Sequence, residues 1–310
     1  MDIWVATHKK LDFDLPQGYK PMQVNCKATG EHWEGYLHDD DGINISEKNG
    51  SYCELTVLYS LWKNARSEVK GLCHYRRYLL PEQKTEIGVW RRIMCSKQEI
   101  KNLALQSPDI EAFLQSYDMI LPVPNGPFGF PVKRERLLYC YQKDLDLLRD
   151  TIQQEYPAYL EAYDWVMEQE FLPSCNMFIA GRDVFDRYCE WLFDLLGKVE
   201  KKCDIDAYDV QHKRVYGYLA ECLLNVYVRK QQLRCKYVSR VMISEYWPEF
   251  QKGIKGFIKT KFVFRSIKNA NPSAFTVWYY KHMEKEKYNN YLLLKQYLAD
   301  REAETVISGR

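Results

Sequence analysis

Ile3-Trp4-Val5-Ala6-Thr7 is an apolar, partly β-branched run, and the polar residues His8-Lys9-Lys10 follow it at once. This pattern predicts a buried strand that ends in a polar loop. Gly71-Leu72-Cys73, followed by His74-Tyr75-Arg76-Arg77, repeats it. Further strands are predicted at 21–26, 117–124 and 176–181, and helices at 51–64, 109–115, 134–170, 185–196 and 219–227. Strands separated by helices indicate an α/β protein with a mixed, mainly parallel sheet flanked by helices.

Composition narrows the class of protein. Of 310 residues, 46% are apolar and 28% charged, which is typical of a folded chain with a large core. Lys and Arg number 44 against 42 Asp and Glu, and this balance argues against a nucleic-acid partner. The ten cysteines include no Cys-x-x-Cys pair, so we expect reduced packing residues rather than zinc ligands or disulfides. Because we find neither a signal peptide nor a membrane-spanning run, we expect a cytoplasmic protein.

The polar residues that follow the predicted strands are candidates for ligand binding. In open α/β sheets, ligands bind beyond the carboxyl ends of the strands. Three clusters are expected there: Thr7-His8-Lys9, His74-Tyr75-Arg76-Arg77 and Asn176. Adjacent arginines can form bidentate bonds to a phosphate or a carboxylate, although an Arg-Arg pair is also common as plain surface charge.

Carboxylates elsewhere leave alternatives open. Asp39, Asp40 and Asp41 can hold Mg²⁺ or Mn²⁺, or can form a solvated turn before Gly42 in a Gly- and Asn-rich loop. Ser51 and Glu54 have capping-box spacing, which favours a helix cap over catalysis for Glu54.

Glu221 lies opposite the apolar stripe of its predicted helix. A solvated helix face is the simpler interpretation of that position. A general base for a sugar hydroxyl is the other, provided that the side chain points into a cleft.

Sequence motifs of other enzyme classes are missing. The chain contains no Gly-x-x-x-x-Gly-Lys-[Ser/Thr], Gly-x-Gly-x-x-Gly, Gly-x-Ser-x-Gly or His-Glu-x-x-His. Kinase, dehydrogenase, serine hydrolase and zinc protease functions are therefore not supported.

The C-terminal part has a different composition. No acidic residue occurs between Glu249 and Glu284, where lysines and arginines alternate with aromatic residues. We expect a globular domain over 1–235 and a basic, aromatic-rich helical extension over 236–310. Residues 253–283 fit the surface of an anionic membrane, or equally a basic face packed on the main domain.

Several of these strings together resemble a bacterial family of capsular and exopolysaccharide glycosyltransferases that was long catalogued as a domain of unknown function. The matching residues are Val5-Ala6-Thr7-His8-Lys9, Asp41-Gly42-Ile43-Asn44-Ile45-Ser46, Asn49, Tyr52-Cys53-Glu54-Leu55-Thr56, Trp62-Lys63-Asn64, Gly71-Leu72-Cys73-His74-Tyr75-Arg76-Arg77, Asn176-Met177-Phe178-Ile179, Tyr188-Cys189-Glu190-Trp191-Leu192-Phe193 and Arg214-Val215-Tyr216-Gly217-Tyr218-Leu219-Ala220-Glu221. The resemblance extends to about residue 230.

The resemblance implies a GT-A-like (Rossmann-like) fold and the transfer of a sugar, galactofuranose being one candidate, from a nucleotide-diphosphate donor such as a UDP-sugar. The implied acceptor is a lipid-linked glycan of capsule, exopolysaccharide or O-antigen synthesis, which would place the protein at the inner face of the cell membrane. On this interpretation Arg76 and Arg77 stabilise the leaving diphosphate, and Glu221 or Asp41 is the catalytic base.

The other implied roles concern the donor. The residues expected near the nucleotide or the donor sugar are Thr7, His8, Lys9, Asp40, Asn44, His74, Tyr75 and Asn176. Many GT-A enzymes hold a metal ion through Asp-x-Asp at a strand end, where this chain has the arginine pair. We therefore expect no required cofactor, with Mn²⁺ or Mg²⁺ at the aspartates as the alternative.

Two rival functions use the same observations. A sugar nucleotidyltransferase or phosphosugar transferase would need the same cationic site. A non-catalytic carbohydrate-binding scaffold would account for the 24 Tyr and 8 Trp.

Overall fold

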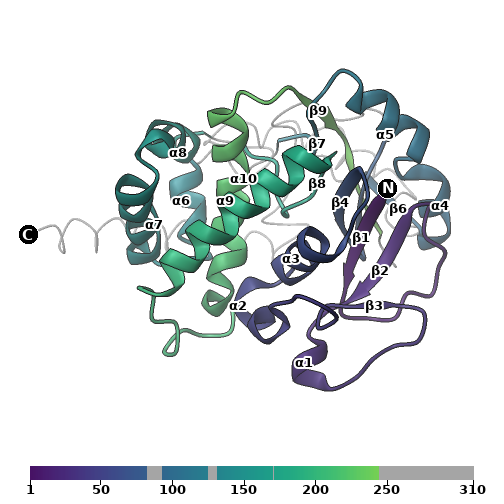
Figure 1. Ribbon diagram of the computed structural model, residues 1–310, viewed down its shortest axis with the longest axis horizontal. Helices are drawn as coiled ribbons and strands as arrows, with labels where there is room; N and C mark the ends of the chain where they lie inside the picture. Colours follow the sequence, from purple (N-terminus) through teal and green to yellow (C-terminus); the bar gives the residue numbers. More distant parts are fainter. Residues whose placement is uncertain (82–92, 125–130, 170, 244–310) are drawn as a thin grey trace, which may run out of the picture.

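The computed structural model describes residues 1–81, 93–124, 131–169 and 171–243 (Figure 1). Its strands are β1 (Asp2–Thr7), β2 (Tyr19–Gln23), β3 (Leu37–His38), β4 (Val69–His74), β5 (Arg77–Leu79), β6 (Ile93–Cys95), β7 (Met119–Pro122), β8 (Phe178–Gly181), β9 (Cys235–Val238) and β10 (Arg240–Ile243). Its α-helices are α1 (Cys26–Thr29), α2 (Asn49–Tyr52), α3 (Leu55–Asn64), α4 (Ile100–Leu103), α5 (Ser107–Leu114), α6 (Val132–Arg136), α7 (Gln142–Glu155), α8 (Leu160–Met167), α9 (Arg182–Glu200) and α10 (Val215–Lys230).

The strands form one mixed sheet. Strands β3, β2, β1 and β4 are parallel neighbours, in that order. Strand β8 lies antiparallel between β4 and β7, and β9 is parallel to β7. Beyond β4, the chain turns into β5, which pairs with β10, and β10 pairs with β6. The expected mainly parallel sheet thus contains two strands that run antiparallel to their neighbours, β8 and β5.

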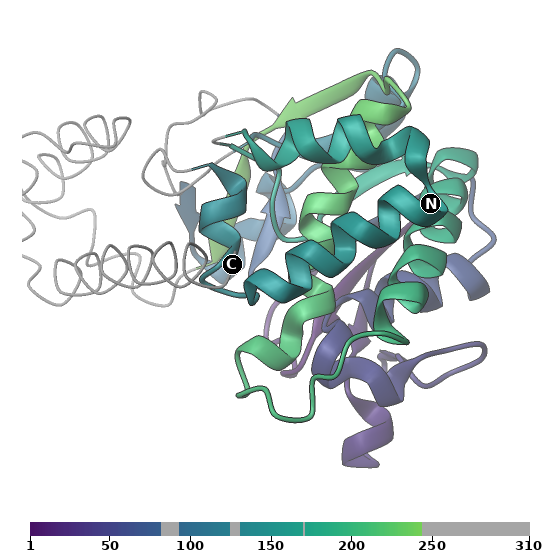
Figure 2. The ribbon, with the colours of Figure 1, turned by 90° about the vertical axis from the view of Figure 1, so that its left-hand side faces the viewer.

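Helices cover both faces of this sheet, which is why its central strands read as continuous apolar runs. Trp4 and Ala6 of β1 point into a core shared with α3, α9 and α10, whereas Ile3 and Val5 point into a core shared with α4 and α5. The alternation follows from the two-residue period of a strand. Figure 1 shows α4 and α5 on the opposite side of the molecule from α7 and α8, and Figure 2 looks onto the α7 and α8 side.

Close packing at the centre of the sheet requires a glycine. A Cβ atom added to Gly71 of β4 would lie 2.6 Å from Ile179 Cγ1 and 2.8 Å from Ile3 Cδ1. Contacts this short do not occur between real side chains, so Gly71 allows β1, β4 and β8 to pack as they do.

Most predicted elements are present, with local corrections. Strand β2 lies at 19–23 rather than 21–26. The short strands β3, β5, β6, β9 and β10 were not predicted. The helix expected over 51–64 is broken at Cys53, whose φ is 53°. The predicted capping box is wrong, because Ser51 donates to the carbonyl of Lys48 and Glu54 makes no side-chain cap.

The domain boundary predicted at 235 falls at the first residue of β9, and both β9 and β10 belong to the sheet. The rest of the predicted extension, including the basic segment 253–283, lies outside the described residues. Within the described part of the chain, no helix is long and apolar enough to cross a membrane.

Candidate functional site

The three predicted polar clusters lie along one edge of the sheet. Thr7 and His74 end the adjacent parallel strands β1 and β4. Asn176 precedes β8, and because β8 is antiparallel to β4, its amino end reaches the edge where the parallel strands have their carboxyl ends. The antiparallel strand therefore brings Asn176 to the predicted binding edge.

Unusual backbone conformations concentrate at this edge. Cys53, Cys175 and Asn176 have φ values of 53°, 73° and 50°, in the left-handed region that non-glycine residues rarely adopt. Each such residue costs on the order of 1–3 kcal/mol and persists only where the surroundings hold it. Such strain is typical of functional sites, which makes the neighbouring residue Glu54 a candidate functional residue.

Glu54 is half-buried at the start of α3. Asn176 donates from its amide nitrogen to Glu54 Oε1 at 2.8 Å and to the carbonyl of Gly217 at 3.0 Å. Burial raises the pKa of Glu54 to about 7; the bond from Asn176 offsets part of that rise, and the charge of Glu221 adds to it. A carboxylate with this pKa can accept a proton near neutral pH.

Glu221, by contrast, is held by its partners. Its Oε2 accepts from the buried guanidinium of Arg136 at 2.7 Å, and its Oε1 accepts from the backbone N–H of Cys175 at 2.9 Å. Arg136 also donates to Glu135 at 2.7 Å. The predicted helix face at Glu221 is therefore a buried ion-pair network, and its carboxylate fixes the backbone before β8.

His74 is another fixed group. Its Nε2 donates to the carbonyl of Cys175 at 2.7 Å. Burial lowers the pKa of His74 to about 4, and the charge of Arg77 lowers it further. At neutral pH this imidazole is uncharged and supports the strained turn at Cys175.

Cationic side chains surround the site. The ring of His8 meets the edge of the Tyr75 ring at 4.8 Å, and the guanidinium of Arg76 lies 4.9 Å from the same ring. Burial lowers the pKa of His8, and the charges of Lys9, Arg76 and Arg214 lower it further. His8, Lys9, Arg76 and Arg214 are exposed. The cations Lys9, Arg76 and Arg214 attract anions such as phosphates, whereas the lowered pKa of His8 favours its uncharged ring.

Two of the predicted site residues, Thr7 and Arg77, have structural roles near the ends of β1 and β4. The buried hydroxyl of Thr7 donates to the carbonyl of Lys9 at 2.5 Å and accepts from its N–H at 3.1 Å. Arg77 is the first residue of β5, opposite His74, and is half-buried, whereas we expected it in a loop. Of the arginine pair, Arg76 is the more exposed.

Asp39 is a structural residue. Its buried carboxylate accepts four hydrogen bonds of 2.7–3.0 Å, whose donors are the backbone N–H groups of Asn25 and Cys26 and the hydroxyls of Ser46 and Thr56. The solvated turn that we considered for the three aspartates is therefore wrong for Asp39. Because these donors occupy both of its carboxylate oxygens, Asp39 is not available as a ligand for Mg²⁺ or Mn²⁺.

The other predicted loop residues are engaged locally. Both carboxylate oxygens of Asp40 lie 3.0 Å from His32 Nε2. The side chain of Asp41 is 65% exposed, and its Oδ2 lies 3.2 Å from His38 Nδ1. Asn44 donates from its amide to the carbonyl of Asp40 at 2.8 Å. Among the described residues, no hydrogen bond joins these three side chains to Glu54 or Asn176.

Comparison with known proteins now adds to this geometry. Residues 2–232 match DUF4422, a family described as a domain of unknown function. The chain belongs to this family. It is also similar to a solved structure, WbbM, a bifunctional glycosyltransferase in its apo form, with 30% sequence identity and a TM-score of 0.72. The match covers 79% of this chain and 45% of the WbbM chain, so the chain spans less than half of that protein. No curated protein sequence matches.

These findings confirm the predicted family and the GT-A-like α/β fold. Sequence reasoning missed the parts played by Arg136, Arg214 and Arg240. Arg214 donates to Cys53 Sγ at 3.1 Å, and Arg240 donates to Cys175 Sγ at 2.9 Å. Arg214 stands at the head of a string that carries the family resemblance, whereas no local pattern marks Arg136 or Arg240.

Proposed function

We propose that this protein is a glycosyltransferase that moves a sugar from a nucleotide-diphosphate donor to a hydroxyl group of a glycan acceptor. The observation that carries the proposal is the 30% identity to a glycosyltransferase over 79% of this chain. The arrangement at the sheet edge supports it. Exposed cations suit a diphosphate, and beside them a carboxylate has its pKa raised to about 7.

In this proposal the cations stabilise the leaving group. Negative charge grows on the diphosphate as the bond between sugar and phosphate breaks, so fixed cations that face it lower the barrier. Arg76 and Arg77 at the turn after β4 take this role, and His8 and Lys9 after β1 lie toward the nucleotide. Thr7 shapes the turn that presents them, because its hydroxyl bonds the backbone of Lys9. In the proposed mechanism these side chains act on the diphosphate directly, without a step through Mg²⁺ or Mn²⁺.

Glu54 is the base in this proposal, in place of the two carboxylates expected from the sequence. Glu221 accepts from Arg136 through one carboxylate oxygen and from the N–H of Cys175 through the other, so both oxygens already have partners within the protein. Asp41 is 65% exposed and paired with His38. Glu54 is half-buried, with a pKa raised to about 7, so it can take the proton of the acceptor hydroxyl as that oxygen attacks the sugar.

Asn176 becomes a positioning residue rather than a sugar ligand. Its side chain is 1% exposed, and its amide nitrogen bonds both Glu54 and the backbone of α10. Its bond to Glu54 orients the carboxylate and stabilises the ionised form. Asp40 and Asn44 have local partners, so the proposal leaves them outside the donor site.

The finer parts of the function depend on the family resemblance and on composition. They are galactofuranose as the donor sugar, a lipid-linked acceptor in capsule, exopolysaccharide or O-antigen synthesis, and attachment to an anionic membrane through the C-terminal extension. Sedimentation with anionic but not neutral vesicles, reversed by salt, tests the membrane part.

The test of function is a panel of nucleotide sugars offered to the full-length protein, with nucleoside diphosphate release and sugar products followed by mass spectrometry. We expect Glu54→Gln to lower turnover by roughly 10²–10⁴, the usual contribution of a general base. Glu47→Gln, which changes an exposed carboxylate, is the matched control. A nucleotide sugar formed rather than consumed would identify a nucleotidyltransferase. No turnover and no thermal stabilisation by nucleoside diphosphates would favour the scaffold.

A further inference from the structure

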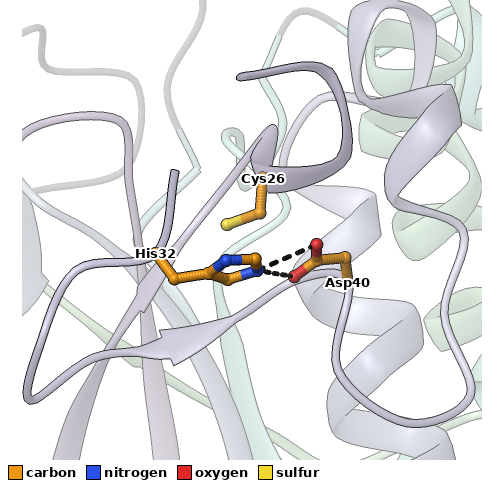
Figure 3. Close-up of side chains that lie close together, drawn as sticks. All are labelled: Cys26, His32 and Asp40. Atoms are coloured by element: carbon orange, nitrogen blue, oxygen red, sulfur yellow. Dashed lines mark hydrogen bonds and ion pairs between the residues drawn. The ribbon is translucent and has the colours of Figure 1, made fainter. Parts of the chain in front are cut away.

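Cys26, His32 and Asp40 form a compact cluster beyond the carboxyl ends of β2 and β3, apart from Glu54 and the cationic residues. Figure 3 shows the His32 ring directed toward the Asp40 carboxylate, with the Cys26 thiol beside the ring. One potential ligand atom from each residue lies within 4.8 Å of the other two. His32 Nε2 is 3.0 Å from both carboxylate oxygens.

The surrounding backbone holds all three residues. The N–H of Cys26 donates to Asp39 at 3.0 Å, so the buried carboxylate that precedes Asp40 also fixes Cys26. The side chain of Gln23 donates to the carbonyl of Glu31 at 2.9 Å and accepts from the N–H of Trp33 at 2.8 Å. These two bonds fix the residues on either side of His32. A preorganised set of ligands on fixed backbone is what a metal site requires.

We propose that Cys26, His32 and Asp40 bind a zinc-class divalent ion, with the fourth position open to water. Thiolate, imidazole and carboxylate are the usual zinc ligands, and three protein ligands plus water is a common tetrahedral arrangement. The thiolate argues against Mg²⁺ and Ca²⁺, which prefer oxygen ligands alone.

The geometry is close to what such an ion needs. Zinc bonds of about 2.0–2.3 Å at tetrahedral angles separate ligand atoms by roughly 3.3–3.6 Å. The nitrogen-to-oxygen distance of 3.0 Å is near that range, and the widest separation, at most 4.8 Å, has to close by about 1 Å. His32 has a side chain that is 48% exposed, so its ring can make that adjustment.

The charges also favour a cation here. The buried Cys26 thiol donates to the carbonyl of Gln23 at 3.5 Å and lies near the carboxylates of Asp39 and Asp40. A divalent ion would displace the thiol proton and offset the local negative charge. Cys26 would then be an exception to the packing role expected for the cysteines.

This site stands apart from the proposed sugar transfer. A bound ion would join the start of α1, the β2–β3 loop and the residue after Asp39, closing a loop that is otherwise held by hydrogen bonds. A measurement of metal binding therefore tests the proposed metal site independently of the proposed glycosyltransferase activity.

The experiment uses the full-length protein, stripped of metal by a chelator and titrated with Co²⁺, a spectroscopic substitute for Zn²⁺. We expect the visible bands of tetrahedral Co²⁺ and a near-ultraviolet thiolate-to-cobalt charge-transfer band, both lost when Zn²⁺ is added. Cys26→Ser should abolish the charge-transfer band. His32→Ala, at an exposed position, should weaken Co²⁺ binding at least tenfold while the circular dichroism spectrum stays unchanged.

Matched controls come from the same chain. Cys235→Ser removes another thiol, and His212→Ala removes a histidine that pairs with Asp209 at 2.6 Å, as His32 pairs with Asp40. Both variants should titrate like the parent protein. If the parent gives no charge-transfer band in excess Co²⁺, or if the band survives in folded His32→Ala at unchanged affinity, the cluster is only an ion pair beside a buried thiol and the proposal is overturned. Should Cys26→Ser not fold, His32→Ala decides the question.

Discussion

Replacement of Glu54 by glutamine should make the protein more stable, and the gain should grow with pH. In the folded protein the pKa of Glu54 is raised from 4.5 to about 7, so the native state holds this proton more tightly than the unfolded chain does. Between these two values stability falls as pH rises, because the unfolded chain releases the proton first. The shift corresponds to about 3 kcal/mol at pH 8 but only about 1 kcal/mol at pH 5.

A glutamine keeps the carbonyl oxygen that can accept from Asn176 and never carries the charge. We therefore expect the free energy of unfolding in urea to rise by about 3 kcal/mol at pH 8 and by about 1 kcal/mol at pH 5 in Glu54→Gln. The exposed control Glu47→Gln should change it by less than about 0.5 kcal/mol at both pH values. An equal change at pH 5 and pH 8 would show that Glu54 titrates normally and would remove the argument for its role as the base.

Other variants test the remaining parts of the structure. Arg76→Ala and Arg77→Ala should each lower turnover by roughly 10²–10³ with a smaller effect on nucleotide affinity, since they act on charge that develops in the transition state; steady-state kinetics would contradict this if turnover were unchanged in both. Arg136→Met leaves two buried carboxylates without their partner and should cost about 3–5 kcal/mol in urea unfolding, and a loss below about 1 kcal/mol would mean that water reaches them. Gly71→Ala should cost about 1–3 kcal/mol because the added methyl group has no room. Gly197→Ala, in the last turn of α9 with open space around it, should instead stabilise by up to about 1 kcal/mol, and thermal unfolding that shifts both variants in the same direction would contradict this contrast.

Local patterns in the sequence were enough to predict the strands at the centre of the fold. The apolar runs at 3–7, 71–73 and 117–124 correspond to β1, β4 and β7, and the polar residues that follow the first two lie at the predicted edge. A strand that is buried on both faces has apolar residues at consecutive positions, so a short stretch of sequence is enough to predict it. The family resemblance added the GT-A-like fold, which the structural likeness to WbbM confirms.

The candidate site depends on contacts that no local pattern encodes. Glu54 and Asn176 are 122 residues apart, and the break at Cys53 and the antiparallel direction of β8 bring them together. From spacing alone Glu54 matched a helix cap, and Glu221 matched a solvated face. Only the tertiary structure decides that Glu54 is half-buried and accepts from the amide of Asn176 while Glu221 is held by Arg136, because the surroundings of a carboxylate are supplied by distant parts of the chain.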